Sequence, residues 1–192
     1  MGLAKKLAKR TQRLARVRKA KDAKKDQRLA NEIHYIMKHR EHEVYDMAET
    51  TWKDTQIVLY TALHERYGFG GKRLRRLFRE VSDLQELIAD NDGSEGDMFR
   101  QFAEETHYNI TPPTAEIDDD DSIKLRSIGR ITGYFFWTLR DKFGFGKGRL
   151  KELSRVCGAI GDDLKEGRRT IQGMKDELNR IDGFWLGGRN AS

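Results

Sequence analysis

The chain has 192 residues, of which 37% are hydrophobic and 35% charged, enough apolar material for one modest core. It has no apolar run long enough to cross a membrane, and a single cysteine excludes an internal disulfide. The net charge of +6 and the pI of about 9.4 favour an acidic partner. The sequence contains no P-loop, Rossmann fingerprint or zinc-ligand spacing, so we expect no enzymatic activity and no cofactor.

A basic arm is expected at residues 1–30. Residues 1–28 contain twelve Lys or Arg and two Asp, a net charge of +10, which leaves −4 for the rest of the chain. Each phosphate that such an arm neutralises releases condensed counterions, giving salt-dependent and largely sequence-independent affinity for nucleic acid. A thin apolar stripe predicts that the arm becomes helical on contact; an anionic membrane or a partner's groove would be alternative targets. The candidate contacts in the arm are Lys5, Lys6, Lys9, Arg10, Arg13 and Arg16.

The charged start never gives way to an apolar core, as a secretory signal would. The lone Cys157 falls on an apolar helical stripe and is interpreted as a core residue in a reducing compartment. We therefore expect a cytoplasmic protein with no membrane partner.

The most specific feature is a fifteen-residue pattern that occurs at residues 63–77 and again 76 positions later, at residues 139–153. Each copy has an aromatic residue, Gly-Phe-Gly, two small or basic residues, Arg-Leu and a second Leu three positions on. This recurrence indicates an internal duplication. We divide the chain into a basic arm, a first helical repeat, an acidic and proline-containing connector, and a second repeat with a C-terminal helix: residues 1–30, 31–91, 92–121 and 122–192.

Apolar residues recur at helical spacing on both sides of each Gly-Phe-Gly, so we expect an all-α fold with two pseudo-repeated helical hairpins. Gly68 and Gly144 occur where a left-handed residue would end the first helix of each hairpin. Phe69 and Phe145 are expected to lie between the two helices and fix their angle. The second helix of each hairpin then presents its unpaired N–H groups at its positive end.

Further helices are expected outside the glycine turns: from about residue 30 through 52 into the first hairpin, at residues 98–105, from about 122 into the second hairpin, and at 170–181. Four aspartates, residues 118–121, precede the third of these and favour the positive end of its dipole. Four aromatic residues, 134–137, crowd one helix, so we expect one or two of them to be exposed.

The segments Tyr67-Gly68-Phe69-Gly70 and Phe143-Gly144-Phe145-Gly146 resemble the helix-hairpin-helix family of DNA-binding motifs. That family has hydrophobic-Gly-hydrophobic-Gly ahead of a helix whose first residues are small or basic. It usually has Ala where this chain has Leu74 and Leu150, and its tandem copies are commonly closer together.

The resemblance implies that the amides of each hairpin bind a duplex phosphate, with nearby cations adding charge. A helix start with close-approach glycines and basic side chains suits an anion on physical grounds as well. The residues that the resemblance assigns to this surface are Gly68, Gly70, Gly71, Lys72, Arg73, Arg76, Gly144, Gly146, Lys147, Gly148, Arg149 and Lys151.

The sequence therefore predicts a non-enzymatic protein that binds double-stranded DNA with little base specificity, with RNA and a homodimer left open. One alternative is that the glycines serve only the turns. Another is that the four aspartates bind Mg²⁺ for phosphodiester cleavage, although consecutive helical residues cannot all face one ion.

This chain, which is small, basic, helical and duplicated and has Gly-Phe-Gly-x-x-Arg-Leu motifs, resembles proteins of phages and mobile elements of Gram-positive bacteria, which include anti-CRISPR inhibitors of the type II-A nuclease Cas9. That resemblance implies a bacterial host cell, where such a DNA-binding protein would act against host nuclease defence. It also implies a third alternative, a protein-directed inhibitor of a CRISPR nuclease or another host nucleoprotein, with DNA contact incidental.

Overall fold

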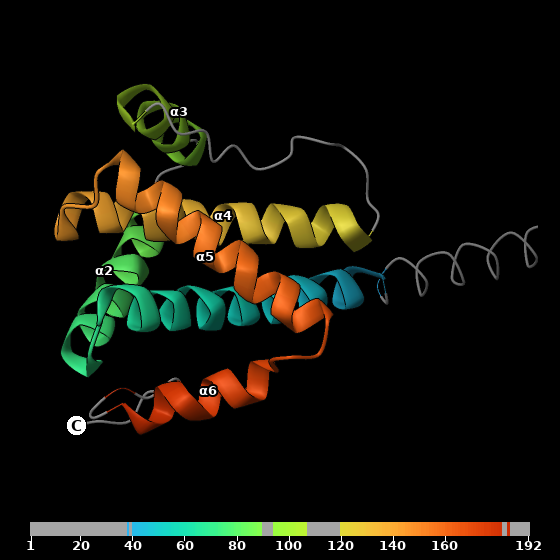
Figure 1. Ribbon diagram of the computed structural model, residues 1–192. Coiled ribbons are helices and arrows are strands. Elements are labelled where there is room, and N and C mark those ends of the chain that lie inside the picture. Colours follow the sequence, from blue (N-terminus) through green and yellow to red (C-terminus); the bar gives the residue numbers. More distant parts are fainter. Residues whose placement is uncertain (1–37, 39, 90–93, 107–119, 182–183, 185–192) are drawn as a thin grey trace, which may run out of the picture. The chain divides into compact units, whose positions relative to one another are not determined.

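The computed structural model describes residues 38, 40–89, 94–106, 120–181 and 184, and across them every regular element is a helix (Figure 1). The chain divides into a unit of residues Met1–Asp46 and a compact unit of residues Met47–Ser192. The glycine turns of both repeats therefore lie in one compact unit. The predicted basic arm, with its six candidate cations, and the proline-containing stretch of the connector lie outside the described residues.

A first helix occupies residues 40–67, and its part from Met47 onward belongs to the compact unit. The later helices are α2 (Gly71–Ala89), α3 (Ser94–Thr106), α4 (Asp120–Phe143), α5 (Lys147–Lys165) and α6 (Ile171–Arg180). The predicted helices at residues 98–105 and 170–181 are confirmed as α3 and α6, the former with additional residues at both ends. Asp120 and Asp121 stand in the first turn of α4, as their charge predicts.

Each Gly-Phe-Gly ends one helix and starts the next within three residues. Gly68 and Gly144 have φ of +62° and +67°, which confirms the left-handed conformation expected of both. The amide of Phe69 donates to the carbonyl of Leu63 at 3.2 Å, and that of Phe145 donates to Leu139 at 3.1 Å. The two turns thus satisfy the last carbonyls of the preceding helix by the same hydrogen bond.

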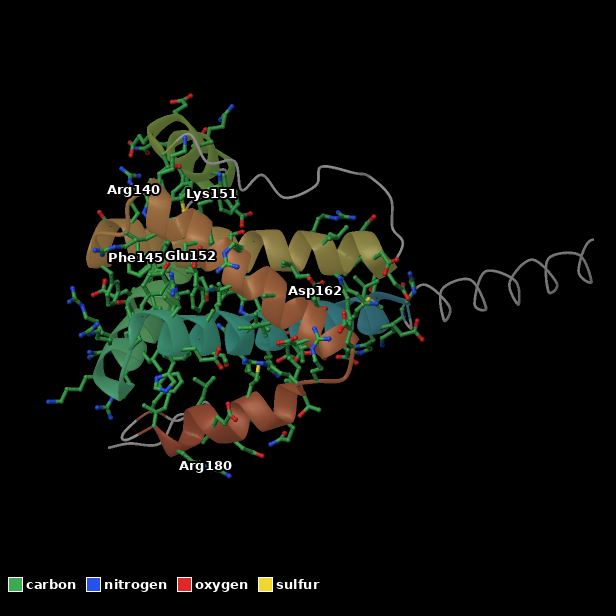
Figure 2. The ribbon with its side chains drawn as sticks, in the orientation of Figure 1. Arg140, Phe145, Lys151, Glu152, Asp162 and Arg180 are labelled. Carbon is green, nitrogen blue, oxygen red and sulfur yellow. The ribbon has the colours of Figure 1, made fainter. Side chains whose placement is uncertain are left out.

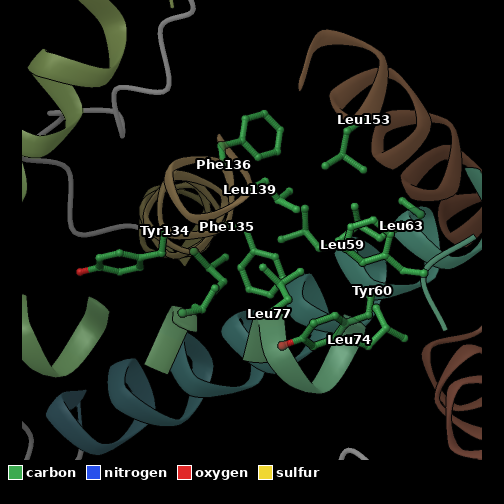
Figure 3. Packing of buried hydrophobic residues seen from close by; sticks show 14 of the residues in the cluster. Leu59, Tyr60, Leu63, Leu74, Leu77, Tyr134, Phe135, Phe136, Leu139 and Leu153 are labelled. Carbon is green, nitrogen blue, oxygen red and sulfur yellow. The ribbon is translucent and has the colours of Figure 1, made fainter. Parts of the chain in front are cut away.

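The core is built from leucines and aromatic residues of both halves (Figure 3). The first helix lies beside α4, with the Tyr60 and Phe135 rings 5.1 Å apart, and α2 packs against α4. Burial follows the same offset as the sequence repeat, since these equivalent pairs are all fully buried: Tyr60 and Phe136, Leu63 and Leu139, Leu74 and Leu150, Leu77 and Leu153. Burying one such leucine stabilises the fold by about 1.5–3 kcal/mol.

The prediction that one or two of the aromatic residues 134–137 are exposed is wrong. Tyr134, Phe135 and Phe136 are buried and Trp137 is half-buried. The reason is α3, which covers the side of α4 that two hairpins alone would leave open: its Phe99 ring lies 6.2 Å from that of Tyr134. A Cβ on Gly133 would come within 2.0 Å of Phe99, so α3 approaches α4 closely at a glycine.

Candidate nucleic-acid interface

The two glycine turns meet each other inside the compact unit. Tyr67 of the first turn contacts Phe145 of the second, with ring centroids 5.0 Å apart. The equivalent pair, Phe143 and Phe69, lies 5.5 Å apart, and Phe69 and Phe145 meet edge to face at 6.0 Å between them. The contacts are therefore reciprocal, as in a pair related by a two-fold axis.

Phe69 and Phe145 are both buried, as the sequence predicts. The sequence predicts that each ring lies between the two helices of its own hairpin, but in these contacts the ring partners of Phe69 and Phe145 belong to the opposite turn. Each turn is thus completed by the other. The periodicity of one hairpin gives no signal of this pairing, because the contact joins residues that are more than seventy positions apart.

Polar contacts also join the two glycine turns. The Tyr67 hydroxyl donates a hydrogen bond to the Arg149 carbonyl at 2.9 Å, and the Arg66 guanidinium lies 3.1 Å from the Glu152 carboxylate. Glu152, on the first half of α5 (Figure 2), also accepts two hydrogen bonds from Arg155. The Arg155 hydrogen bonds lower the pKa of Glu152, with Arg66 adding to the effect. Burial, followed by the charge of Glu152, raises the pKa of Tyr67.

A groove with a volume of about 700 Å³ runs along this junction. Its lining residues are Tyr67, Phe69, Lys72, Arg73, Arg76, Lys142, Phe143, Phe145 and Arg149. Five of these nine residues are cations, and none carries a carboxylate. The groove therefore combines aromatic surface with positive charge, part of which is paired outside the lining: Arg76 lies 3.6 Å from the Glu80 carboxylate, and Lys142 lies 2.9 Å from that of Asp141.

Three guanidinium groups are held over rings of the groove. Arg73 lies 5.5 Å from the Phe69 ring centroid and its equivalent Arg149 lies 5.7 Å from that of Phe145. Arg76 of α2 lies 5.1 Å from the Phe143 ring of the other turn. Cation–π attraction orients these side chains without neutralising their charge.

The predicted cations of the two turns divide into two groups. Lys72, Arg73, Arg76 and Arg149 line the groove, whereas Lys147 and Lys151 are exposed on α5 outside its lining. Sequence reasoning missed Lys142, which also lines it. The available signal was a cation at the same position of both copies, because Lys142 stands directly before the aromatic residue of the second copy and its counterpart Arg66 does so in the first.

The N-terminal ends of α2 and α5 differ from those of the other described helices. Helices α3 and α4 carry carboxylates in their first turn, and Thr170 caps α6 by accepting a hydrogen bond from the Gly173 amide. Helices α2 and α5 have no acidic residue there, and no side chain caps α5 at Gly146. Their first turns instead carry cations, which the positive end of a helix dipole disfavours: Lys72, Arg73, Lys147 and Arg149.

None of these four cations has a carboxylate within 4.0 Å in the part of the chain that the structure describes. The unfavourable charge at both helix starts is therefore not relieved from within the described protein. An external anion would relieve it at both places.

The glycines of the turns play two different roles. Gly68 and Gly144 are required by their positive φ, but Gly146 has φ −76° and ψ 172°, which any residue can adopt. A Cβ on Gly70 or on Gly146 would meet no atom within 4 Å. The fold therefore has no steric need for glycine at these two positions, which directly precede the first residues of α2 and α5.

His64 serves the first turn: its Nδ1–H donates to the Phe69 carbonyl at 2.9 Å. Its counterpart in the second copy, Arg140, instead pairs with Glu105 of α3 and lies over the Trp137 ring. Equivalent positions next to the glycines thus do different structural work.

Within the described ranges no group of three or more His, Cys, Asp or Glu side chains is arranged to hold a metal ion. None of the helices described is both long enough and apolar enough to span a membrane. No protein-family model, curated protein or solved structure matches this chain.

Proposed function

We propose that the two glycine turns form a phosphate-binding surface for duplex DNA and that the protein binds DNA without catalysing a reaction on it. The observation that carries the proposal is the pair Gly70 and Gly146. Each is a glycine without a steric reason in the fold, and each stands at the start of a helix whose first turn is basic. Absence of a side chain there lets an anion approach the amides closely.

The charges support the same proposal. Cations at the positive end of a helix destabilise the unbound protein. When a phosphate binds there, the same cations attract it and stabilise the complex. The amides of Gly70, Gly71 and Lys72 would hold one phosphate, and those of Gly146, Lys147 and Gly148 a second. Lys72, Arg73, Lys147 and Arg149 add charge at the two places. The reciprocal packing of the turns fixes the distance between the two phosphate sites.

The test is the double charge reversal Lys72→Glu/Lys147→Glu, measured by fluorescence anisotropy on a labelled duplex across a salt series, with and without residues 1–30. Because the variant neutralises two fewer phosphates than its parent, the magnitude of the slope of log affinity against log salt concentration should decrease by about 2. A matched control is Lys124→Glu/Lys165→Glu, which makes the same change in net charge at the ends of α4 and α5 distant from the turns.

If, without residues 1–30, the turn variant binds duplex DNA as tightly as its parent and with the same salt slope, the glycine turns are scaffolding. The search then moves to a protein partner.

A further inference from the structure

The groove between the turns contains more than duplex phosphate contacts require. Phosphate recognition needs amides and cations, but four of the nine lining residues are aromatic. Two of them, Tyr67 and Phe143, are only half-buried and so keep accessible ring surface. A volume of about 700 Å³ is the size of a small-molecule site and cannot admit a double helix.

The charge of the groove selects its occupant. Its lining has five cations and no carboxylate, and three of the cations (Lys72, Arg73 and Arg149) have no carboxylate within 4.0 Å among the described residues, so the occupant is an anion. Three of the cations are guanidinium groups held beside rings, and both kinds of surface stack on nucleic acid bases. A single-stranded nucleotide offers a phosphate for the cations and an unpaired base for the rings.

The groove is also asymmetric where the turns are symmetric. Arg76 lies in the groove, with Glu80 of its own helix 3.6 Å away, whereas its counterpart Glu152 is paired with Arg66 and Arg155 and does not line the groove. Lys72 likewise lines the groove, and its counterpart is Gly148. Two equivalent turns suit the two equivalent strands of a duplex, whereas one groove with most of its charge on α2 suits one strand.

We propose that this groove binds a short single-stranded segment, so that the protein recognises the junction between duplex DNA and a single strand. The inference rests on the proposed function, because the turns hold the duplex part of such a junction. The occupant is a nucleotide chain, with its phosphates on Lys72, Arg76 and Lys142 and its bases against Tyr67 and Phe143.

The experiment uses the full chain and three labelled probes: a blunt duplex, the same duplex with a thymidine extension, and the thymidine oligonucleotide alone. The variants are Phe143→Leu and Arg76→Gln. Their matched controls on α2 are Phe78→Leu, a ring that is 46% exposed outside the groove, and Arg79→Gln, an exposed cation outside its lining. Circular dichroism verifies that each variant is folded.

We expect the extended duplex to bind about tenfold more tightly than the blunt one, the effect of stacking one base. Phe143→Leu should reduce the extended-duplex affinity more than the blunt-duplex affinity, which also decreases because the Phe143 ring packs on Phe69 between the two phosphate sites. Arg76 is exposed, so Arg76→Gln should fold normally. This variant should weaken binding of the extended duplex more than binding of the blunt duplex. Both controls should retain the full preference.

A photoreactive 5-iodouracil in the extension should form adducts at Tyr67 or Phe143, located by mass spectrometry. Equal affinity for blunt and extended duplexes overturns the inference and leaves the proposed function standing, provided that Lys147→Glu still weakens the blunt duplex. The inference is also overturned if the control variants lose the preference to the same extent as the groove variants. It is overturned as well if polyglutamate competes with the extended duplex as effectively as thymidine oligonucleotides do. If the protein binds none of the three probes, both proposals are overturned.

Discussion

The first glycine turn, residues 63–77, and the second, residues 139–153, have equivalent backbones and different side chains. Both have a left-handed glycine, the same hydrogen bond from the following phenylalanine, and a guanidinium over that phenylalanine's ring. They differ where the first has Arg76 and the second has Glu152. The first copy therefore supplies charge to the groove, while the second uses the same position to fasten the two copies together.

This difference separates what a turn needs from what a binding surface needs. Backbone geometry and buried leucines are the same in both copies because each must end one helix and pack the next. The exposed positions are free of that requirement, and there the copies differ in charge. The comparison can be tested position by position, since most substitutions in one turn have an exact counterpart in the other.

The largest effect is expected from Leu74→Ala and Leu150→Ala, each of which empties a fully buried site of the common core. Each should lower the free energy of unfolding by about 2–5 kcal/mol, the usual cost of such a cavity. Urea unfolding followed by circular dichroism and tryptophan fluorescence measures the cost. Both variants should unfold in one transition, and Leu87→Ala, on a side chain that is 60% exposed, should cost less than about 0.5 kcal/mol. Two separate transitions would mean that the copies do not share a core.

Within each turn, the two glycines should respond in opposite ways. Gly68→Ala and Gly144→Ala place a Cβ at a positive φ and should each destabilise the protein by about 1–2 kcal/mol. Gly70→Ser and Gly146→Ser introduce a good N-cap into open space, so stability should be unchanged or rise by a few tenths of a kcal/mol.

The serine hydroxyl, however, competes for the amides that we assign to phosphate. Duplex affinity, measured by anisotropy, should fall in Gly70→Ser and Gly146→Ser although thermal stability does not. Unchanged DNA affinity in both serine variants would indicate that these amides bind no phosphate.

A smaller effect is expected from Tyr67→Phe, which removes the hydrogen bond to the Arg149 carbonyl and leaves the ring contacts in place. The cost should be about 0.5–1.5 kcal/mol by urea unfolding at pH 7. Because the folded-state pKa of Tyr67 is raised above 10.0, any contribution from its protonation is constant below about pH 10. It is lost as the pH rises through the raised value. A stability difference between Tyr67→Phe and the parent that already changes between pH 6 and pH 9 would contradict this assignment.

The smallest effect is expected from Cys157→Val, because Cys157 is the counterpart of the buried Val81. The substitution should change the free energy of unfolding by less than about 1 kcal/mol. Burial raises the pKa of the Cys157 thiol to about 12, so at pH 8 it is almost entirely protonated and a poor nucleophile. Mass spectrometry after iodoacetamide treatment should find Cys157 unmodified in the native protein and modified in urea. Rapid alkylation of the native protein would show that the thiol is accessible.

Much of the fold could be predicted from the chain because the relevant interactions are local. Helical periodicity located the helices on either side of Gly68 and Gly144, and glycine at a helix end predicted the left-handed conformation that the structure confirms. The helix expected at residues 170–181 was likewise found as α6. Each of these depends on residues within one or two helical turns.

The aromatic residues of α4 and the groove depended on longer-range contacts. Nothing near Tyr134 in the sequence indicates that Phe99 of α3 covers it. Lys142 became part of the candidate site only because its turn lies against Arg76 of α2.

The sequence by itself determined where each Gly-Phe-Gly ends one helix and starts the next and that the two turns share one backbone, because sterics and periodicity act between near neighbours. Only the tertiary structure decided that each turn is completed by the other and that Arg76 lines the groove while Glu152 does not. The physical reason is that a groove formed by two distant segments takes its charge from whichever side chains their packing brings together.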